Sequence, residues 1–464
     1  MPDTTTQPAL PLFAGKTWQS SPIPFPLTHE QLDEIHQIGH ACHAFLQASE
    51  HLYHRSAQGK KILRNSDTLI PWVAAYLDRG KPDGLLAHGR HPAIKNQIPR
   101  ILRPDLLITD TGFTLTELDS VPGGIGLTAH LNAHYATAHT APPIGGNTQP
   151  ELFYQSIAAL APHAPSPLIA IIVSDEAATY RPEFEWLAQT LRAQGRRVHC
   201  AHPADLMPLG NTITIPLDGT PERVDIIYRF FELFDLGNVK GADALFDAIE
   251  AGHVALTPPM KAYQEEKLNL ALLHHPALHE YWRENLLPAH HATLLRIVPR
   301  TWIMESAELP PCAVLHAPAL NGKPIRAWAE LANASQKERN LIIKASGFHE
   351  TAWGARSVIL GSDIPRDEWQ AALEDATDPE NETYYIMQDY HKPTRKHHPI
   401  HQPDGTTASA STRVRLCPYY FLPANATAPQ LGAILATLCP ADKKIIHGMK
   451  DAALLPCALQ PPSP

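Results

Sequence analysis

Residues 101–119 have the pattern of a β-hairpin that carries charged side chains. The segment ILRPDLLIT is followed by the turn Asp110-Thr111-Gly112 and then by FTLTELD. A three-residue turn that ends in glycine is typical of a hairpin with a bulge, and pairing of Thr109 with Phe113 would set its register. Because side chains alternate between the two faces of a strand, this register decides which charged residues meet.

In that register Asp105 lies opposite Glu117, Arg103 lies opposite Asp119, and the four side chains share one face. Opposed carboxylates about 5 Å apart repel each other and favour a bound cation. Together with Asp119 they offer oxygen ligands that suit Mg²⁺, and the Arg103 guanidinium suits a transferring phosphoryl group. The alternative is a solvated hairpin with a surface Arg103–Asp119 ion pair, and spacing alone leaves both interpretations open.

A lysine ends a second apolar strand. Lys344 follows Leu341-Ile342-Ile343, and the next loop begins Ala345-Ser346-Gly347. A buried lysine needs a partner such as a phosphate, which the N–H groups of a glycine-bearing loop also bind. No Lys-Ser/Thr pair follows the glycine, so this is not a Walker A motif. The alternative is a lysine whose ammonium snorkels to water from an ordinary hairpin.

Three further residues could serve a nucleotide, and each has an ordinary alternative. Lys267 lies near the expected start of a helix, where a cation is disfavoured unless neighbouring glutamates compensate it. Gln388 lies on an apolar strand that could be an adenine shelf or a plain strand end. Arg415 shares a strand face with Arg413, and the pair could bind phosphates or form surface ion pairs.

The surrounding sequence predicts the elements that position these residues. Apolar spacing indicates helices over 27–80, with Thr28 and Gln31 as a capping box. Residues 168–206 have the pattern of a βαβ unit, with the strand LIAIIVSD, a helix that ends at Gly195, and the strand RRVHCAHPADL. Such segregated helices and strands indicate an α/β protein with several lobes.

Composition limits the possible partners. The chain has 464 residues, of which 44% are hydrophobic, enough for two or three lobes. Its net charge of −9 argues against nucleic acid or an anionic membrane as the main partner. The start has no basic segment before an apolar stretch, and no apolar run is long enough to cross a bilayer. We therefore expect a cytoplasmic protein.

Histidine and cysteine patterns give no metal motif. The chain contains no HExxH, and its histidine cluster at 396–401 lies in a polar, Pro-containing stretch, which predicts a solvated loop. The six cysteines are scattered without a CxxC pair, which predicts free thiols.

In their order along the chain, these motifs resemble the circularly permuted ATP-grasp proteins, specifically the ligase portion of glutathionylspermidine synthetases. The resemblance runs from the hairpin to the strand of Arg415. It is carried by Arg103-x-Asp105, Glu117-x-Asp119, Val224-Asp225-x-x-Tyr228-Arg229, the segment from Lys261 to Lys267, Ile343-Lys344-x-Ser346-Gly347, and Gln388. No single motif is specific, but the ordered set is.

The resemblance implies a multi-lobed α/β ATP-grasp fold with a Rossmann-like substrate-side domain. It implies an ATP- and Mg²⁺-dependent ligase that joins a small-molecule or peptide carboxylate to an amine through an acyl-phosphate. Asp105, Glu117 and Asp119 would be the Mg²⁺ ligands, and Arg103 would steady the phosphoryl group. The implied nucleotide-binding residues are Lys267, Lys344, Ser346, Gly347, Gln388 and Arg415.

The chain departs from this family at two points. Asp119 stands where the family usually has Asn, so an extra carboxylate would tighten cation binding and repel phosphate unless a second metal is present. The amidase domain of the bifunctional enzymes has no counterpart. We expect consecutive regions: a mostly helical 1–95, a metal-binding part 96–150, the Rossmann-like domain 151–235, a helical connection 236–330, and the nucleotide-binding lobe with the C-terminal tail 331–464.

Two other functions remain open. One is a non-catalytic or regulatory ATP-binding protein of the same fold. The other is a nucleotide-sugar transferase built on the βαβ unit at 168–206, although that unit lacks a GxGxxG motif.

Overall fold

The computed structural model describes residues 18–67, 69–138, 142–239, 241–352, 354–402, 404–448 and 451–460. They form two compact units, each built from separate stretches of the chain. Unit 1 contains the described residues of 1–43, 88–260 and 393–464, and unit 2 contains those of 44–87 and 261–392. The consecutive regions expected from the sequence divide the chain differently, since 1–95, 236–330 and 331–464 each contain residues of both units; that division stays a prediction.

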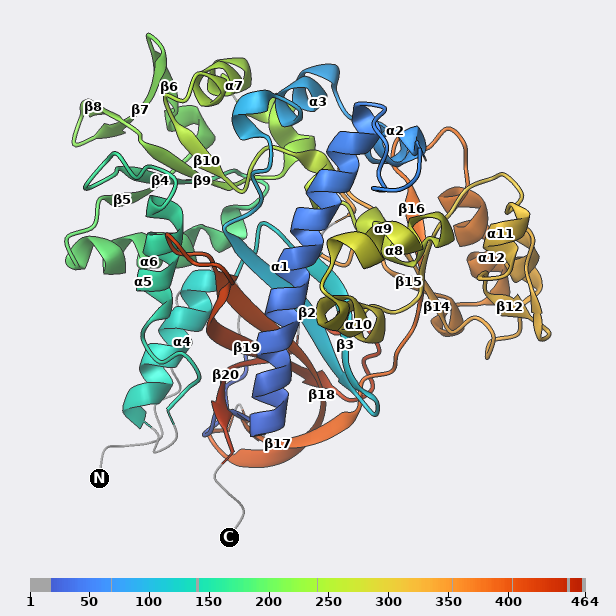
Figure 1. Ribbon diagram of the computed structural model, residues 1–464. Coiled ribbons are helices and arrows are strands. Elements are labelled where there is room, and N and C mark those ends of the chain that lie inside the picture. Colours follow the sequence, from blue (N-terminus) through green and yellow to red (C-terminus); the bar gives the residue numbers. More distant parts are fainter. Residues whose placement is uncertain are drawn as a thin grey trace. The chain divides into compact units, whose positions relative to one another are not determined.

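The large sheet of unit 1 has the strand order β1-β20-β19-β18-β2-β3, with β17 paired to β18 (Figure 1). Its strands are β1 (Phe25–Leu27), β2 (Ile101–Thr109), β3 (Gly112–Asp119), β17 (Arg395–His401), β18 (Thr407–Phe421), β19 (Gln430–Pro440) and β20 (Ala453–Leu459). β1 runs parallel to β20, and the other neighbours pair antiparallel. Helices α4 (Ile125–Ala138) and α5 (Gln149–Ala158) pack against its strands.

A parallel sheet in unit 1 contains the predicted βαβ unit. Its order is β10-β9-β4-β5, and all neighbours are parallel. Its elements are β4 (Ile169–Val173), α6 (Arg181–Ala193), β5 (Val198–Ala201), β9 (Ile226–Phe230), α7 (Ala242–Glu250) and β10 (Ala255–Thr257). The prediction of strand, helix and strand over 168–206 is therefore confirmed. A separate antiparallel sheet is formed by β6 (Met207–Leu209), β7 (Thr212–Leu217) and β8 (Thr220–Arg223).

Unit 2 has its own sheet, of order β11-β16-β14-β15, and a hairpin of β12 and β13. Its strands are β11 (Thr301–Ile303), β12 (Ala319–Leu320), β13 (Lys323–Pro324), β14 (Leu341–Ala345), β15 (Ile359–Leu360) and β16 (Tyr385–Asp389). Its helices include α2 (Pro71–Asp78), α8 (Leu268–His274), α9 (His279–Asn285), α10 (Pro288–Ile297), α11 (Pro311–Val314) and α12 (Arg366–Ala376). Trp328, Trp369 and Ile343 belong to the apolar core that this sheet shares with its helices.

The long helix α1 (His29–Ala57) begins at the predicted capping box. The backbone N–H of Gln31 donates to the Thr28 hydroxyl, and the backbone N–H of Thr28 donates to the Gln31 side chain, at 3.2 and 3.0 Å. A second helix, α3 (Asp83–Gly89), follows α2. None of the helices in the described ranges combines the length and the apolarity that crossing a bilayer requires.

The histidine cluster is not the solvated loop that its composition predicts. Residues 395–401 form β17, which pairs with β18 over its whole length. His398 is 2% exposed, and its Nε2 lies 2.9 Å from the Ser21 hydroxyl. The prediction failed because strand pairing and burial of one histidine outweigh the polar composition of the segment.

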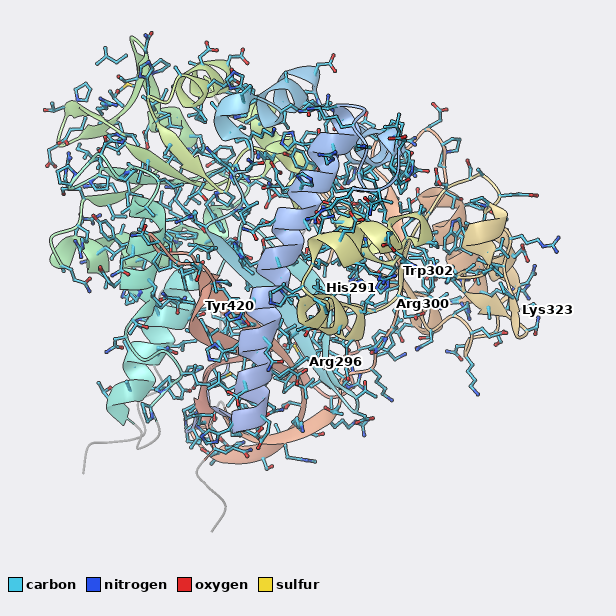
Figure 2. The ribbon with its side chains drawn as sticks, viewed as in Figure 1. His291, Arg296, Arg300, Trp302, Lys323 and Tyr420 are labelled. Atoms are coloured by element: carbon cyan, nitrogen blue, oxygen red, sulfur yellow. The ribbon has the colours of Figure 1, made fainter. Side chains whose placement is uncertain are left out.

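A close contact joins α1 to the sheet within unit 1. The Tyr420 side chain, labelled in Figure 2, lies on β18 and is buried. Its hydroxyl donates to the Ile35 carbonyl of α1 at 2.5 Å. A Cβ atom on Gly39 would lie 2.1 Å from Cε1 of the Tyr420 ring. Only glycine therefore allows the helix to approach this strand so closely.

We predict that Gly39→Ala lowers the free energy of unfolding by about 1–3 kcal/mol, because overpacking outweighs the higher helix propensity of alanine. Chemical denaturation monitored by circular dichroism measures the change. Gly84→Ala is the matched control, since this helical glycine has no neighbouring atom within 4 Å of an added Cβ. Equal stability of the two variants would contradict the prediction.

Candidate functional site

The charged hairpin forms with the predicted pairing at its site end. Asp105 lies opposite Glu117, and Arg103 lies opposite Asp119. The turn end differs from the prediction, because Thr109 pairs with Gly112 rather than with Phe113. A bulge next to Asp105 shifts the register by one residue and so restores the expected pairs.

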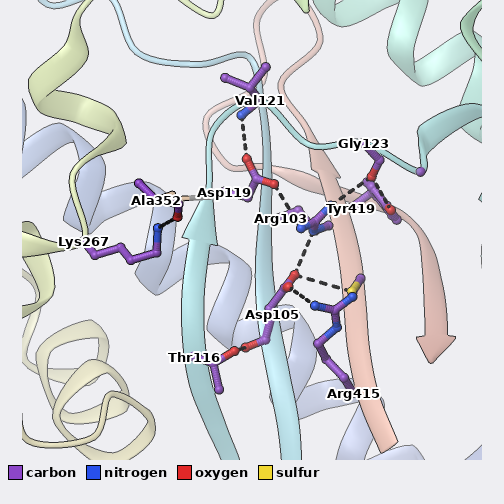
Figure 3. Close-up of polar contacts among 12 residues, drawn as sticks. Arg103, Asp105, Thr116, Asp119, Val121, Gly123, Lys267, Ala352, Arg415 and Tyr419 are labelled. Atoms are coloured by element: carbon purple, nitrogen blue, oxygen red, sulfur yellow. Dashed lines mark hydrogen bonds and ion pairs between the residues drawn. The ribbon is translucent and has the colours of Figure 1, made fainter. Parts of the chain in front are cut away.

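Asp105 is a buried carboxylate held between two arginines, as Figure 3 shows. It is 2% exposed; its Oδ1 accepts from Nε of Arg103 at 2.8 Å, and its Oδ2 lies 2.9 Å from Nη1 of Arg415. The Cys417 thiol also donates to Oδ1. Burial alone would raise the pKa of Asp105, but the two guanidinium groups outweigh it and lower the pKa below its ordinary value.

Arg103 is fixed by three acceptors on three sides. Besides Asp105, its Nη2 lies 2.9 Å from Oδ2 of Asp119, and its Nη1 donates to the Gly123 carbonyl at 2.9 Å (Figure 3). These contacts use three of the five guanidinium N–H groups. The Arg103 side chain is 13% exposed, so the alternative of a solvated hairpin with a surface ion pair is not what the structure shows.

Asp119 has a different electrostatic environment from Asp105. Its Oδ1 accepts from the backbone N–H of Val121 at 2.8 Å, and its Oδ2 pairs with Arg103. Burial raises the pKa of Asp119, and the nearby Glu117 and Asp105 carboxylates add to this, so that the favourable effect of Arg103 is outweighed. Of the two aspartates, Asp119 is thus the one whose negative charge is less well compensated.

Carboxylate oxygens are suitable ligands for a magnesium ion, but the arrangement of these side chains does not form a magnesium site. Both oxygens of Asp105 and of Asp119 already meet a donor in the site. Within the described residues, no group of three or more His, Cys, Asp or Glu side chains is placed to hold a metal ion. Arginines balance these carboxylates here, and the assignment of Asp105, Glu117 and Asp119 as Mg²⁺ ligands stays a prediction.

Sequence reasoning missed Glu183, which anchors the loop beside Arg103. This α6 residue is fully buried, and its carboxylate accepts from the backbone N–H groups of Gly124 and Leu127 at 2.7 and 2.9 Å. Gly123, in the same loop, accepts from Arg103 and from the Tyr419 hydroxyl. Glu183 lies four positions before Leu187, on the apolar face of the predicted helix. A charged residue on such a face indicates a buried polar contact, and this pattern could have identified it.

In unit 2, Lys344 lies buried at the end of β14 and does not snorkel to water. It is 5% exposed, and its ammonium donates to the side-chain carbonyl of Gln388 at 2.9 Å. Gln388 lies on the neighbouring strand β16, opposite Ile342, and donates in turn to the Thr301 hydroxyl at 2.9 Å. Two of the predicted nucleotide-binding residues are therefore in direct contact.

The loop after Lys344 packs against the carboxylate of Glu266. Ser346 is fully buried and donates to the Glu266 carboxylate, which also pairs with Lys81 at 2.6 Å. A Cβ atom on Gly347 would lie 2.9 Å from Cδ of Glu266, so a larger residue would displace this carboxylate from its contacts with Ser346 and Lys81. A role of Gly347 in phosphate binding stays a prediction.

Lys267 lies against the same loop. Its backbone N–H donates to the Ser346 carbonyl at 2.9 Å, and its ammonium donates to the Ala352 carbonyl at 2.6 Å (Figure 3). Lys267, Lys344, Ser346, Gly347 and Gln388 all belong to unit 2. Arg415 belongs to unit 1, where it pairs with Asp105.

Glu183 predicts a pH dependence of stability. Burial raises the pKa of Glu183 to about 7, although the backbone N–H groups of Leu127 and Gly124 oppose the rise. The pKa of Glu183 is thus higher in the folded protein than in the unfolded chain. Its contribution to the free energy of unfolding is therefore full below about pH 4.5 and is lost as the pH rises towards 7. The loss is about 3 kcal/mol. Between pH 5 and pH 8 the wild type should lose more thermal stability than Glu183→Gln. Glu185→Gln, at an exposed position of α6, is the control, and parallel pH slopes for all three proteins would contradict the prediction.

Comparisons with known proteins concern the fold. No protein-family model matches the chain, and no curated protein matches it. The apo structure of a glutathione synthetase-like effector from Globodera pallida is similar, with a TM-score of 0.57 and 11% identity over 97% of this chain and 92% of that one. A candidate gamma-glutamylcysteine synthetase from Methylobacillus flagellatus has a TM-score of 0.43 and 11% identity over 94% and 89% of the two chains, too low a score to argue from. This chain therefore has a mixed α/β fold similar to that of a glutathione synthetase-like protein.

Proposed function

We propose that the protein is an ATP- and Mg²⁺-dependent ligase of the circularly permuted ATP-grasp type. It joins a carboxylate to an amine through an acyl-phosphate. The observation that carries the proposal is Arg103, a guanidinium fixed by Asp105, Asp119 and a loop carbonyl on the hairpin that the family resemblance singled out. The likeness of the fold to a glutathione synthetase-like protein supports it.

The proposed reaction has two displacements. An oxygen of the substrate carboxylate attacks the γ-phosphorus of ATP, and ADP leaves. The amine nitrogen then attacks the acyl carbon, phosphate leaves, and the nitrogen loses a proton. Neither displacement needs a nucleophilic side chain, because such transfers are accelerated mainly by positioning and by charge stabilisation.

The two arginines of unit 1 supply the charge stabilisation in this proposal. Arg103 keeps two N–H groups beyond the three that its protein acceptors use, and these would bind an anionic oxygen of the reacting group. Arg415 adds a second positive charge on the neighbouring strand, across the Asp105 carboxylate. Because their ion pairs hold both guanidinium groups before substrate binds, little reorganisation is needed in the transition state.

The nucleotide is proposed to bind unit 2. Lys344 would contact its phosphates, Gln388 would lie beside the adenine, and Lys267, Ser346 and Gly347 would line the phosphate loop. The support is the clustering of these five residues around one strand end and its loop. A carboxylate–amine substrate panel, scored by phosphate release and product mass, tests the function. Binding of ATP without phosphate release from any pair would favour the non-catalytic alternative.

We predict that Lys344→Ala weakens binding of a non-hydrolysable ATP analogue by about 10-fold or more, since a charge-assisted hydrogen bond contributes about 1.5–3 kcal/mol. Isothermal titration calorimetry measures the affinity, and circular dichroism checks the fold. Lys323→Ala removes an exposed lysine of the same unit and should leave the affinity unchanged (Figure 2). If both variants bind like the wild type, Lys344 has no role in nucleotide binding.

The carboxylates of the hairpin give a second prediction. If Glu117 is a Mg²⁺ ligand, as the family resemblance implies, Glu117→Gln should abolish turnover, because it removes a charged ligand oxygen. The variant should stay folded, since the position is half-buried and outside the apolar core. Asp119→Asn should stay folded, keep Mg²⁺-dependent ATP binding and lose less activity, since the amide retains one oxygen and matches the residue usual in the related ligases. Phosphate release and ATP titration at several Mg²⁺ concentrations measure both variants. Loss of ATP binding in Asp119→Asn as complete as in Glu117→Gln would contradict the role given to Asp119.

A further inference from the structure

Unit 1 contains a pocket of about 200 Å³ that none of the candidate-site residues lines. Its lining comes from the short 3₁₀ helix η1 (Pro92–Ile94), from the segment that follows α5, from the link between β8 and β9, and from the link between α7 and β10. Pockets for drug-sized ligands usually measure about 300–1,000 Å³, so this one suits a smaller molecule, about the size of an amino acid.

The pocket lies at the amino-terminal edge of the parallel sheet. Asp225 directly precedes β9, and Val254 and Ala255 are at the start of β10. Glu183, which holds the loop beside Arg103, lies instead in the first turn of α6, the helix that follows the carboxyl end of β4. Because β4, β9 and β10 run parallel, the pocket and this loop are at opposite edges of one sheet. The pocket is therefore separate from the candidate site.

Two opposite charges line the pocket without neutralising each other. Arg223 donates from Nη2 to the His253 carbonyl at 3.2 Å, and it forms no ion pair among the described residues. Asp225 accepts the backbone N–H of Leu168 on Oδ2 at 2.8 Å, and no described cation pairs with it either. Within this part of the chain, four of the five guanidinium N–H groups and the Oδ1 atom of Asp225 are therefore available to a ligand.

The innermost part of the lining is apolar. Ile249, Val254 and Leu256 are 7%, 3% and 4% exposed, and all three line the pocket. An aliphatic group placed on this surface would leave water, which contributes about 0.8 kcal/mol for each buried methylene. The lining thus offers a cation, an anion and an apolar surface to one small molecule.

We propose that this pocket binds a free α-amino acid with an aliphatic side chain. The carboxylate of the ligand pairs with Arg223, its ammonium group pairs with Asp225, and its side chain packs on the apolar surface. A simple carboxylate would be repelled by Asp225 and a simple amine by Arg223, so a zwitterion is the ligand that both charges favour. The proposal does not rest on the proposed function, because binding requires neither ATP nor turnover.

The ligand chemistry is tested by isothermal titration calorimetry of the full-length protein with L-leucine and three analogues. One analogue, 4-methylpentanoate, lacks the ammonium group; another, 3-methylbutylamine, lacks the carboxylate; and glycine lacks the aliphatic side chain. We expect each analogue to bind about 10-fold or more weakly than L-leucine, since each loses a charge-assisted contact or the buried aliphatic group.

Variants of the two charged residues locate the binding. Arg223→Gln should bind L-leucine about 10-fold or more weakly. Arg192→Gln is the matched control, because Arg192 is also exposed and donates to one backbone carbonyl, that of Val198, but does not line the pocket. Asp225→Asn keeps an oxygen for the Leu168 N–H and should lose the preference for L-leucine over 4-methylpentanoate. Thermal melting checks the fold of each variant.

Each contrary result removes a defined part of the proposal. Equal affinity of the wild type for L-leucine and 4-methylpentanoate would overturn the assignment of a zwitterion. A wild type that binds none of the four compounds, or an Arg223→Gln variant with wild-type affinity for L-leucine, would overturn the site itself. If L-leucine binding depends on Arg223 while no substrate pair is turned over, the pocket assignment stands and the ligase proposal fails.

Discussion

A carboxylate enclosed in a sheet is costly unless cations, hydrogen-bond donors or a proton compensate its charge, and at Asp105 two arginines do so. Its partners come from two strands, Arg103 from β2 itself and Arg415 from the neighbouring β18. Removal of either arginine would leave a buried charge partly uncompensated, which typically costs several kcal/mol. The positions of both guanidinium groups, and with them the chemistry available to unit 1, therefore depend on this one carboxylate.

The same network extends from the large sheet of unit 1 to its parallel sheet. Arg103 holds the Gly123 carbonyl, and Glu183 of α6 holds the next residue of the loop through its N–H group. Glu183 is itself costly to bury in its charged form, as its raised pKa shows. One short loop is thus held by an arginine that Asp105 positions and by the buried carboxylate of Glu183.

Local patterns in the sequence predicted the local structure well. The capping box at Thr28, the βαβ unit and the pairs Arg103–Asp119 and Asp105–Glu117 depend on residues close in sequence, where spacing and strand periodicity carry the information. The strands β19 and β20 were not predicted, because nothing in their apolar runs indicates which strands they pair with. The placement of Arg415 beside Asp105 depends on pairing between distant segments, which no local pattern records.

The pairing of β1 with β20 has a consequence for biosynthesis. These strands lie side by side in the sheet, yet the residues of both units are translated between them. On the ribosome, β1 emerges early and cannot find its partner until nearly all of the described chain has been made. Such long-range contacts fold slowly and leave strand edges exposed in the meantime. The sheet that holds Arg103 and Arg415 is therefore completed late in synthesis, and its strand edges stay unpaired until then.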